Sequence, residues 1–266
     1  MVTGVSEVLA RTRQEGRAAL IGYLPVGFPT VEGSIEAMVA MADAGADIVE
    51  VGLPYTDPLM DGPVIQSAAT RALENGVRVS DVFQAARAIT DAGSAAVVMT
   101  YWNPVLRYGV SQFAASLRDS GASGLITPDL VPDEAGDWIA ASDEYDLDRI
   151  FLVAPSSTPQ RLASTTAATR GFVYAASLMG VTGARATVGD QAQVLVERTR
   201  AVTDLPICVG LGVSTPDQAA QVAQFADGVI VGSALVRQLL DADTAAAGLA
   251  DLRTLTGQLA DGVRRS

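Results

Sequence analysis

Two carboxylates lie where short apolar runs give way to loops, and the first is Glu50. It lies near the end of the run "DIVEVG", in which Val49 and Val51 take the alternate positions. Because side chains alternate between the two faces of a strand, Ile48 and Glu50 share the face opposite to the valines. If the valines face outer helices, Glu50 points into an interior with little water, where burial raises the pKa of a carboxyl. Such a group can transfer protons at neutral pH; the alternative is a glutamate that reaches the rim or pairs with an arginine.

The second carboxylate is Asp61, in the longest connection of the chain, which begins "LPYTDPLMDGPVIQ" after this strand. Long loops in compact domains are often functional. Pro63 suits the first turn of a helix, so Asp61 is either a turn or cap residue or a second carboxylate over the cavity mouth opposite Glu50. The residues alone leave both interpretations open.

Glycines and hydroxyl residues follow the last three apolar runs, in "SLMGVTGARATVG", "GLGVSTP" and "GSALV". Backbone N–H groups of such loops and of a helix N-terminus can hold a phosphate, so we predict a phosphate site without any lysine.

Aromatic residues end other strands. Tyr23 in "IGYLPVG" and Tyr174 in "GFVYAAS" are candidate ligand contacts, with core packing as the alternative. Tyr101, Trp102 and Asn103 in "MTYWNPVLRYG" are expected either to supply apolar walls for a flat aromatic ligand or to pack under a lid.

Two residue types are absent, which narrows the chemistry. The chain has no histidine, and all 18 basic residues are arginines. This excludes Ser-His and Cys-His nucleophile pairs, histidine-bound zinc, lysine Schiff bases and a pyridoxal phosphate anchor in this chain. Carboxylates, tyrosines and backbone amides must therefore carry any catalysis. The single cysteine, Cys208 in "LPICVGLG", is predicted to be a small buried hydrophobe.

The elements that would position these residues alternate regularly. Eight apolar runs are separated by amphipathic, alanine-rich helical patterns, which predicts an eightfold β/α (TIM) barrel with an extra N-terminal helix from "SEVLARTRQEG". In such a barrel the carboxyl ends of all strands meet at one mouth. A doubly wound sheet is the alternative, but no G-x-G-x-x-G follows the first strand. The runs are "AALIGYLP", "DIVEVG", "AAVVMTY", "SGLITPD", "RIFLVAP", "GFVYAAS", "PICVGLG" and "DGVIVGS".

Length and charge set broader limits. With 266 residues and 49% hydrophobic content, we expect one domain over residues 1–266. A net charge of −12 and a pI near 4.4 argue against nucleic acid and anionic membranes as partners. No apolar run approaches the ~18 to 20 residues needed to span a bilayer, and the start lacks the pattern of a secretory signal. A cytoplasmic protein is therefore expected.

Several segments together resemble one family, in its order and over nearly the whole chain. They are "DIVEVGLPYTDPLMDGPVIQ", "MTYWNPV", "TPDLVPDE", "YAASLMGVTGAR", "VGLGVSTPDQ" and "GVIVGSALV". They resemble the tryptophan synthase alpha subunit, especially that of high-GC bacteria. The resemblance implies a carbon-carbon lyase that cleaves indole-3-glycerol phosphate to indole and glyceraldehyde 3-phosphate in a retro-aldol reaction. By this resemblance Glu50 is the proton-shuttling glutamate, and Asp61 is the aspartate that binds the indole N–H.

The resemblance also implies the other contacts and the partner. By the resemblance Tyr174 lines the substrate pocket, and we expect Tyr23 to contact the substrate as well. The phosphate region comprises Thr182, Gly183, Gly212, Gly232 and Ser233. The implied partner is a tryptophan synthase beta subunit in an alpha2-beta2 tetramer. No cofactor is expected in this chain; pyridoxal phosphate is expected in the beta subunit. Leu211 and Thr56 replace residues that are commoner in the family.

The absence of lysine and histidine agrees with this reaction. A retro-aldol cleavage usually needs an imine or a metal to accept electrons, whereas an indole ring can be protonated at the carbon that bears the side chain. Two alternatives remain: a stand-alone indole-releasing lyase, and a non-catalytic phosphate-ligand regulatory subunit. The presence of both Glu50 and Asp61 counts against the second. Other phosphate-binding barrels generally use lysine, histidine or cysteine arrangements that are absent here.

Overall fold

The strands of the molecule form one parallel sheet. The structure is a computed structural model that describes residues 4–177 and 188–264. Neighbouring strands follow the order β5-β4-β3-β2-β1-β9-β8-β7-β6, and every pair is parallel. The strands are β1 (Ala19–Pro25), β2 (Ile48–Gly52), β3 (Ala95–Met99), β4 (Gly124–Ile126), β5 (Asp148–Ile150), β6 (Leu152–Val153), β7 (Val173–Ala176), β8 (Ile207–Gly210) and β9 (Gly228–Val231).

The sheet closes into a barrel through Phe151. This residue alone separates β5 from β6, which are the two ends of the strand order. The predicted run "RIFLVAP" is thus two short strands: β5 pairs with β4, and β6 pairs with β7. At the change of neighbour, the Phe151 carbonyl accepts the N–H of Tyr174 at 3.1 Å. If β5 and β6 are counted as one strand, the barrel has eight strands, so the predicted eightfold barrel is confirmed.

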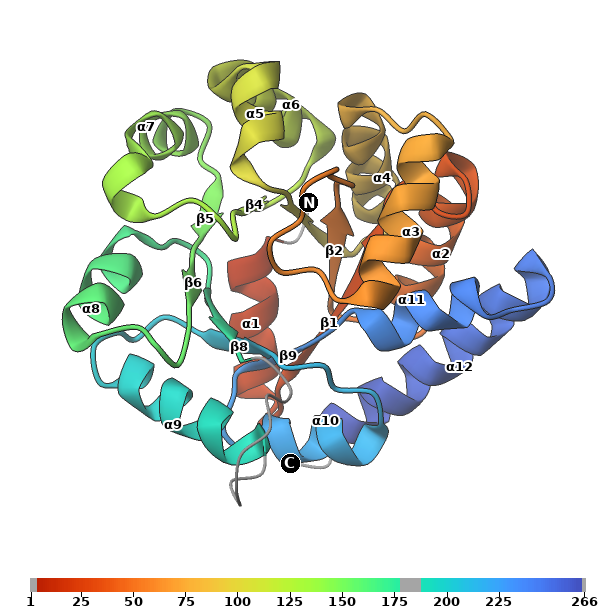
Figure 1. Cartoon of the computed structure of the whole chain (residues 1–266). Helices are drawn as coiled ribbons and strands as arrows, with labels where there is room; N and C mark the ends of the chain where they lie inside the picture. Colours follow the sequence, from red (N-terminus) through yellow and green to blue (C-terminus); the bar gives the residue numbers. More distant parts are fainter. Residues whose placement is uncertain (1–3, 178–187, 265–266) are drawn as a thin grey trace.

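Helices surround the strands, and α1 lies inside this ring (Figure 1). Two helices follow each of β2, β3 and β9, where a simple β/α repeat has one. The helices are α1 (Val5–Gln14), α2 (Val31–Asp43), α3 (Pro63–Glu74), α4 (Val79–Asp91), α5 (Trp102–Tyr108), α6 (Val110–Ser120), α7 (Gly136–Glu144), α8 (Pro159–Ala168), α9 (Val188–Arg200), α10 (Pro216–Ala223), α11 (Ser233–Leu240) and α12 (Ala245–Val263), with the 3-10 turn η1 (Pro132–Glu134) before α7.

Hydroxyl side chains begin several of these helices, as the sequence predicts. The Thr30 hydroxyl accepts the N–H of Gly33 at the start of α2, and Thr215 does the same for Gln218 in α10. Each satisfies a backbone donor that the helix itself leaves unpaired. At helix C-termini, glycine can serve the corresponding role. Gly121 ends α6 in a left-handed conformation (φ 81°), which glycine adopts without strain.

Two apolar layers lie on the two sides of the sheet. Val49 and Val51 face outward into a large cluster shared with the helices, whereas Ile48 faces the barrel interior. The predicted alternation along β2 is therefore confirmed. The inner cluster also includes Val8 and Leu9 of α1, so the extra N-terminal helix covers the amino end of the barrel.

Inward positions change character toward the carboxyl ends of the strands. Aliphatic side chains such as Ile48 fill the lower interior, and Tyr23, Glu50 and Tyr174 follow them at the next inward positions. This end of the barrel therefore holds the polar groups that sequence analysis identified. Within the residues described, no helix is long and apolar enough to cross a membrane.

Candidate active site

A cavity of about 250 Å³ opens at the carboxyl ends of the strands. Its wall includes the carboxyl groups of Glu50 and Asp61 and the glycines Gly212 and Gly232. Apolar side chains also line it, among which is Met99. A ligand with a flat apolar ring and a charged tail would fit this cavity. Ligand sites of this kind are mostly apolar, and a few polar groups at fixed positions orient the ligand.

Glu50 is the most unusual group in this cavity. Its side chain is completely buried, and neither carboxyl oxygen has a hydrogen-bond partner among the described residues. In the β1–β2 register its neighbour on the inner face is Tyr23. Burial, and then the charge of Asp61, raise the pKa of Glu50 from 4.5 to about 8. The expectation of an inward, perturbed glutamate agrees with this geometry, and the alternative of a rim or arginine-paired residue does not.

Asp61 reaches the same cavity from the loop after β2. Its Oδ1 accepts a hydrogen bond from the Tyr101 hydroxyl at 3.1 Å, and its backbone carbonyl accepts one from Gln66 Nε2 at 2.7 Å. Burial raises the pKa of Asp61, while the hydrogen bond from Tyr101 lowers it. The cap of α3 is Gly62, without a side-chain hydrogen bond, so the alternative of Asp61 as the helix cap is wrong.

Tyr23 and Tyr174 both line the cavity, and each lies against a glycine of the adjacent strand. A Cβ at Gly52 would lie 2.4 Å from the Tyr23 hydroxyl, and one at Gly210 would lie 2.5 Å from that of Tyr174. Burial is the first cause that raises the pKa of both phenols, followed by the charge of Asp61 for Tyr23 and of Glu50 for Tyr174. Both tyrosines therefore stay neutral beside the carboxylates.

Residues of the predicted phosphate region lie in the wall of the cavity. Gly212, Gly232 and Ser233 all line it, and Ser233 is the first residue of α11. A helix N-terminus presents N–H groups and a partial positive charge that favour an anion. Thr182 and Gly183, predicted as further contacts, lie outside the described residues.

Other predicted positions have different roles. Tyr101, Trp102 and Asn103 are not among the residues that line the cavity. The Trp102 amide donates to Asp129 Oδ1 at 2.9 Å, and Asn103 Nδ2 donates to Tyr55 at 3.2 Å. These residues anchor loops and do not wall a ligand.

The apolar walls come instead from residues that sequence analysis missed. Leu152 and Ile230 line the cavity from strands, and Ile65 lines it from α3. Alternation along β6 and β9 could have identified the first two as inward residues. Ser177 was also missed; it lines the cavity, and its buried hydroxyl has no hydrogen-bond partner in the part of the chain that the structure describes.

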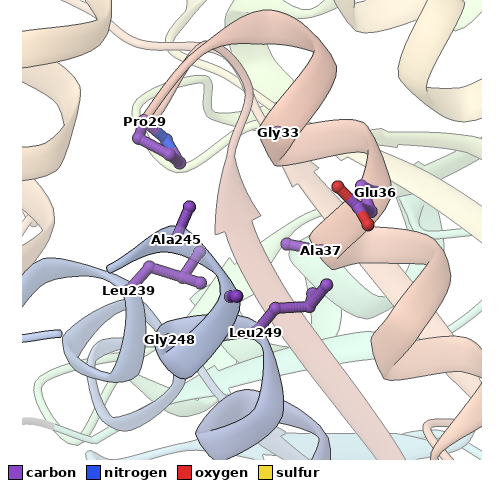
Figure 2. Close-up of a pocket in the computed structure, with 9 residues that line it drawn as sticks. Pro29, Gly33, Glu36, Ala37, Leu239, Ala245, Gly248 and Leu249 are labelled. Atoms are coloured by element: carbon purple, nitrogen blue, oxygen red, sulfur yellow. The ribbon is translucent and has the colours of Figure 1, made fainter. Parts of the chain in front are cut away.

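A second pocket lies away from these groups, between α2 and α12. Figure 2 shows its apolar wall, with Ala37 on one side and Leu249 on the other, and the carboxylate of Glu36 at its edge. Glu36 is the single titratable residue of its lining, so this pocket lacks the paired groups that catalysis requires. Among the residues that the structure describes, no group of three or more His, Cys, Asp or Glu could hold a metal ion.

Comparisons with known proteins give one consistent result. Residues 9–264 match the family model described as tryptophan synthase alpha chain. The chain is 61% identical over 262 residues to the tryptophan synthase alpha chain of Mycobacteroides abscessus, with 98% of each chain covered. It resembles a solved structure of Mycobacterium tuberculosis tryptophan synthase at 60% identity and a TM-score of 0.91, with 99% of each chain covered. The alpha subunit from Legionella pneumophila is more distant, at 30% identity and a TM-score of 0.88, with 97% of each chain covered.

Proposed function

The chain belongs to the tryptophan synthase alpha chain family, the lyases that cleave indole-3-glycerol phosphate to indole and glyceraldehyde 3-phosphate, and we propose that Glu50 and Asp61 carry out this cleavage. The observation that carries the assignment is Glu50, a fully buried carboxyl in the cavity wall to which no described residue donates a hydrogen bond. Proteins seldom bury such a group unless it has a task, since burial without a partner costs free energy.

The substrate lies across the cavity with its two ends in different surroundings. Its phosphate binds near Gly212, Gly232 and Ser233, which line the cavity at the N-terminus of α11, where helix N–H groups favour an anion. Its indole ring lies among the apolar walls, and the ring N–H donates to Asp61. The apolar lining and the presence of Asp61 in the same wall support this orientation.

Glu50 moves the proton. With a pKa of about 8 it is protonated at neutral pH and gives its proton to the ring carbon that bears the side chain. The bond from that carbon to the side chain then breaks, and its electron pair restores the aromatic ring. The hydroxyl on the departing carbon becomes the aldehyde and returns its proton to the Glu50 carboxylate. Glu50 ends each cycle protonated, as it began.

Asp61 stabilises the intermediate charge. Protonation of the ring carbon leaves a positive charge on the ring nitrogen, and an ionised carboxylate at the N–H lowers the energy of that state. The hydrogen bond from Tyr101 favours the ionised form of Asp61. Two carboxyl groups that differ in protonation can thus serve as acid and counter-charge in one cavity.

This mechanism requires no cofactor in this chain, and we infer that the pyridoxal phosphate of the complete synthesis is bound by the partner. The protonated indole ring accepts the electrons for which other retro-aldol enzymes use a lysine imine or a metal. The chain contains no lysine that could form such an imine. A cytoplasmic location stays a prediction.

We infer that the partner is a tryptophan synthase beta subunit in an alpha2-beta2 complex, which docks at the barrel mouth. Among the described residues, six large hydrophobic side chains are exposed. Four of them, Leu59, Met60, Leu106 and Val131, lie in the connections after β2, β3 and β4. Exposed apolar residues grouped in this way favour a protein interface. It borders the cavity, so indole could pass to the partner without crossing much solvent.

We also infer that the described residues form one domain. Strand β1 pairs with β2 on one side and with β9 on the other, so the barrel closes only when both ends of the chain meet. No division of the chain would leave two closed sheets.

The substitution Glu50→Gln tests the proposed chemistry. It keeps the shape of the side chain and removes the acid, so indole release should fall by about 100-fold or more. Binding of 3-(indol-3-yl)propyl phosphate, which retains the ring and the phosphate, should persist. The matched control is Glu36→Gln in the second pocket, which should release indole at the wild-type rate. If the wild type binds the phosphate compound and releases no indole, alone or with a beta subunit, a regulatory binding subunit is the better account.

A further inference from the structure

The hydroxyl of Tyr101 connects three consecutive residues of the loop after β2. It accepts the backbone N–H of Leu59 and that of Met60, each at 3.0 Å. It lies 3.1 Å from Asp61 Oδ1. One side chain from the connection after β3 thus binds two amides and the carboxylate of a loop that lies 40 positions earlier in the chain.

These three contacts leave the hydroxyl one orientation. A phenol oxygen has two lone pairs and one proton. The two amides are donors, so they use the lone pairs, and the proton is left for Asp61 Oδ1. Tyr101 is therefore the donor and Asp61 Oδ1 the acceptor. Asp61 Oδ2 is left for a further donor, because no other described residue donates to it.

Tyr101 itself is firmly held. Only 4% of its surface is exposed, and its ring centre lies 5.3 Å from that of Tyr55. The next residue, Trp102, begins α5 and its amide is fixed by Asp129. The hydroxyl therefore has a defined position relative to the barrel, because the ring that carries it cannot turn freely.

Apart from Tyr101, the side chains that bind this loop include Gln66, which donates to the Asp61 carbonyl, and Asn103, which donates to the Tyr55 hydroxyl. Residues 53–62 contain no helix or strand. Leu59 is 77% exposed and Met60 is 38% exposed, so neither side chain fixes the segment. Short irregular segments with little burial open at low free-energy cost unless a specific contact holds them.

We propose that Tyr101 is the positioning residue for Asp61: its hydroxyl fixes residues 59–61 over the cavity and occupies Oδ1, so that Oδ2 accepts the N–H of the substrate ring. This inference deepens the proposed function and rests on the role given there to Asp61. Tyr101 touches no reacting atom, since it is absent from the cavity lining. It acts through Asp61.

The charged and buried surroundings of Asp61 disfavour its ionised form, and a hydrogen bond from Tyr101 counteracts this effect. Glu50 of β2 lies close enough for the two carboxyl groups to raise each other's energy when both are ionised, and the phenols of Tyr23 and Tyr174 face the same space. Burial favours the neutral form of Asp61, and the bond from Tyr101 is the contact that lowers its pKa. Loss of that bond should shift Asp61 toward its neutral form, which cannot balance a positive ring nitrogen.

The test is Tyr101→Phe in the full-length chain, with Tyr55→Phe as the matched control. The control removes the hydroxyl of the adjacent ring, which contacts Asn103 and not Asp61. We expect Tyr101→Phe to lower kcat/KM for indole release by about 10-fold or more, as loss of a hydrogen bond to a charged group does. The low-pH limb of its kcat/KM profile should move to higher pH. Tyr55→Phe should stay within about twofold of the wild type.

A double-mutant cycle separates positioning from packing. If Tyr101 acts through Asp61, Tyr101→Phe should change kcat/KM by less than about twofold in an Asp61→Asn background. The affinity for 3-(indol-3-yl)propyl phosphate gives a second cycle where turnover is too slow to measure. Additive losses in both cycles, or a Tyr101→Phe variant with wild-type kcat/KM, would overturn the inference. An Asp61→Asn variant with full activity would instead remove the proposed function, and the inference with it.

Amide hydrogen exchange tests the loop directly and does not depend on turnover. The Leu59 and Met60 amides should exchange about 10-fold faster or more in Tyr101→Phe than in the wild type, because they lose their acceptor. They should be unchanged in Tyr55→Phe. Unchanged exchange at both amides in a folded Tyr101→Phe variant contradicts the proposal.

Discussion

At the scale of single residues, the proposed site depends on one carboxyl kept in an unfavourable place. Glu50 is buried in the barrel wall, and no residue within 4–177 or 188–264 forms a salt bridge or donates a hydrogen bond to it. The same burial that makes it a proton donor at neutral pH opposes folding once it ionises, because an unpaired buried charge is costly. Catalysis and stability therefore make opposite demands on Glu50.

This conflict predicts a pH-dependent stability. The pKa of Glu50 is about 8 in the folded chain and near 4.5 otherwise, so the unfolded chain releases this proton first as the pH rises. Between those values the folded state binds more protons, and its stability must fall with increasing pH. The loss is on the order of 4 kcal/mol between pH 5 and pH 8, at ~1.4 kcal/mol per pH unit.

Urea unfolding of wild type and Glu50→Gln at several pH values measures this effect, and other titrating groups cancel in the comparison. The variant should gain stability relative to the wild type as the pH rises from 5 to 8. A constant difference over this range would mean that Glu50 titrates normally.

The sequence predicts one carboxylate of the site better than the other. For Glu50 the alternation with Val49 and Val51 is sufficient, because a strand has only two faces. For Asp61 the local residues allow a helix cap equally well. The deciding contact comes from Tyr101, which is distant in the chain and was expected either to wall a ligand or to pack under a lid. Contacts between loops depend on the three-dimensional course of both, which no periodicity encodes.

At the scale of elements, α1 closes the barrel at the end opposite to the site. Val5, Val8 and Leu9 pack against the first inward residues of the strands. The Val5 amide also donates to the Ser123 hydroxyl before β4, at 3.1 Å. Water is thereby kept from the base of the barrel, beneath Glu50.

A charge on the inner face of α1 should destabilise the whole fold. Val8 is 1% exposed, so Val8→Asp places an unpaired carboxylate in the inner cluster and should cost about 3 kcal/mol or more. Ala10→Asp makes a comparable change on the exposed side of the same helix and is the control. Urea unfolding of both variants at one pH checks this. Equal stabilities would show that α1 does not contribute to the closure of the barrel.

Elements were predicted more accurately than their edges. The eight runs and the alternating helices suffice for a barrel, because buried parallel strands are continuously apolar and the helices between them are amphipathic. The interruption at Phe151 was not predicted, since it arises from which neighbour each half of the run pairs with.

At the scale of the whole molecule, the barrel mouth combines the substrate cavity with four of the six exposed large hydrophobic side chains of the described residues. Leu59 is two positions from Asp61, so a partner that covers Leu59 contacts the loop that carries the carboxylate. Such a contact would favour one arrangement of that loop, and occupancy of the cavity would favour the same one. Binding of the partner and of the substrate should therefore reinforce each other.

A charge in this apolar surface should weaken assembly. Leu106 is 55% exposed on α5, and Leu106→Asp should raise the Kd for a beta subunit by about 10-fold or more, since interface truncations of 1 to 2 kcal/mol are common. Val194→Asp on α9 changes a side chain of similar exposure (53%) outside the surface and is the control. Calorimetric titration measures both. Equal affinities would exclude this face as the docking site.

The glycines beneath the two tyrosines have a consequence for evolution. Because a Cβ at Gly52 would collide with the Tyr23 hydroxyl, positions 23 and 52 occupy one shared volume. Positions 174 and 210 form a second pair of the same kind. A substitution of either glycine by a larger residue should disrupt the pocket until a second substitution replaces the tyrosine by a smaller residue. Such paired positions should drift together among descendants of this chain, and a mutagenic library that varies both codons of a pair should find reshaped pockets that single-codon libraries miss.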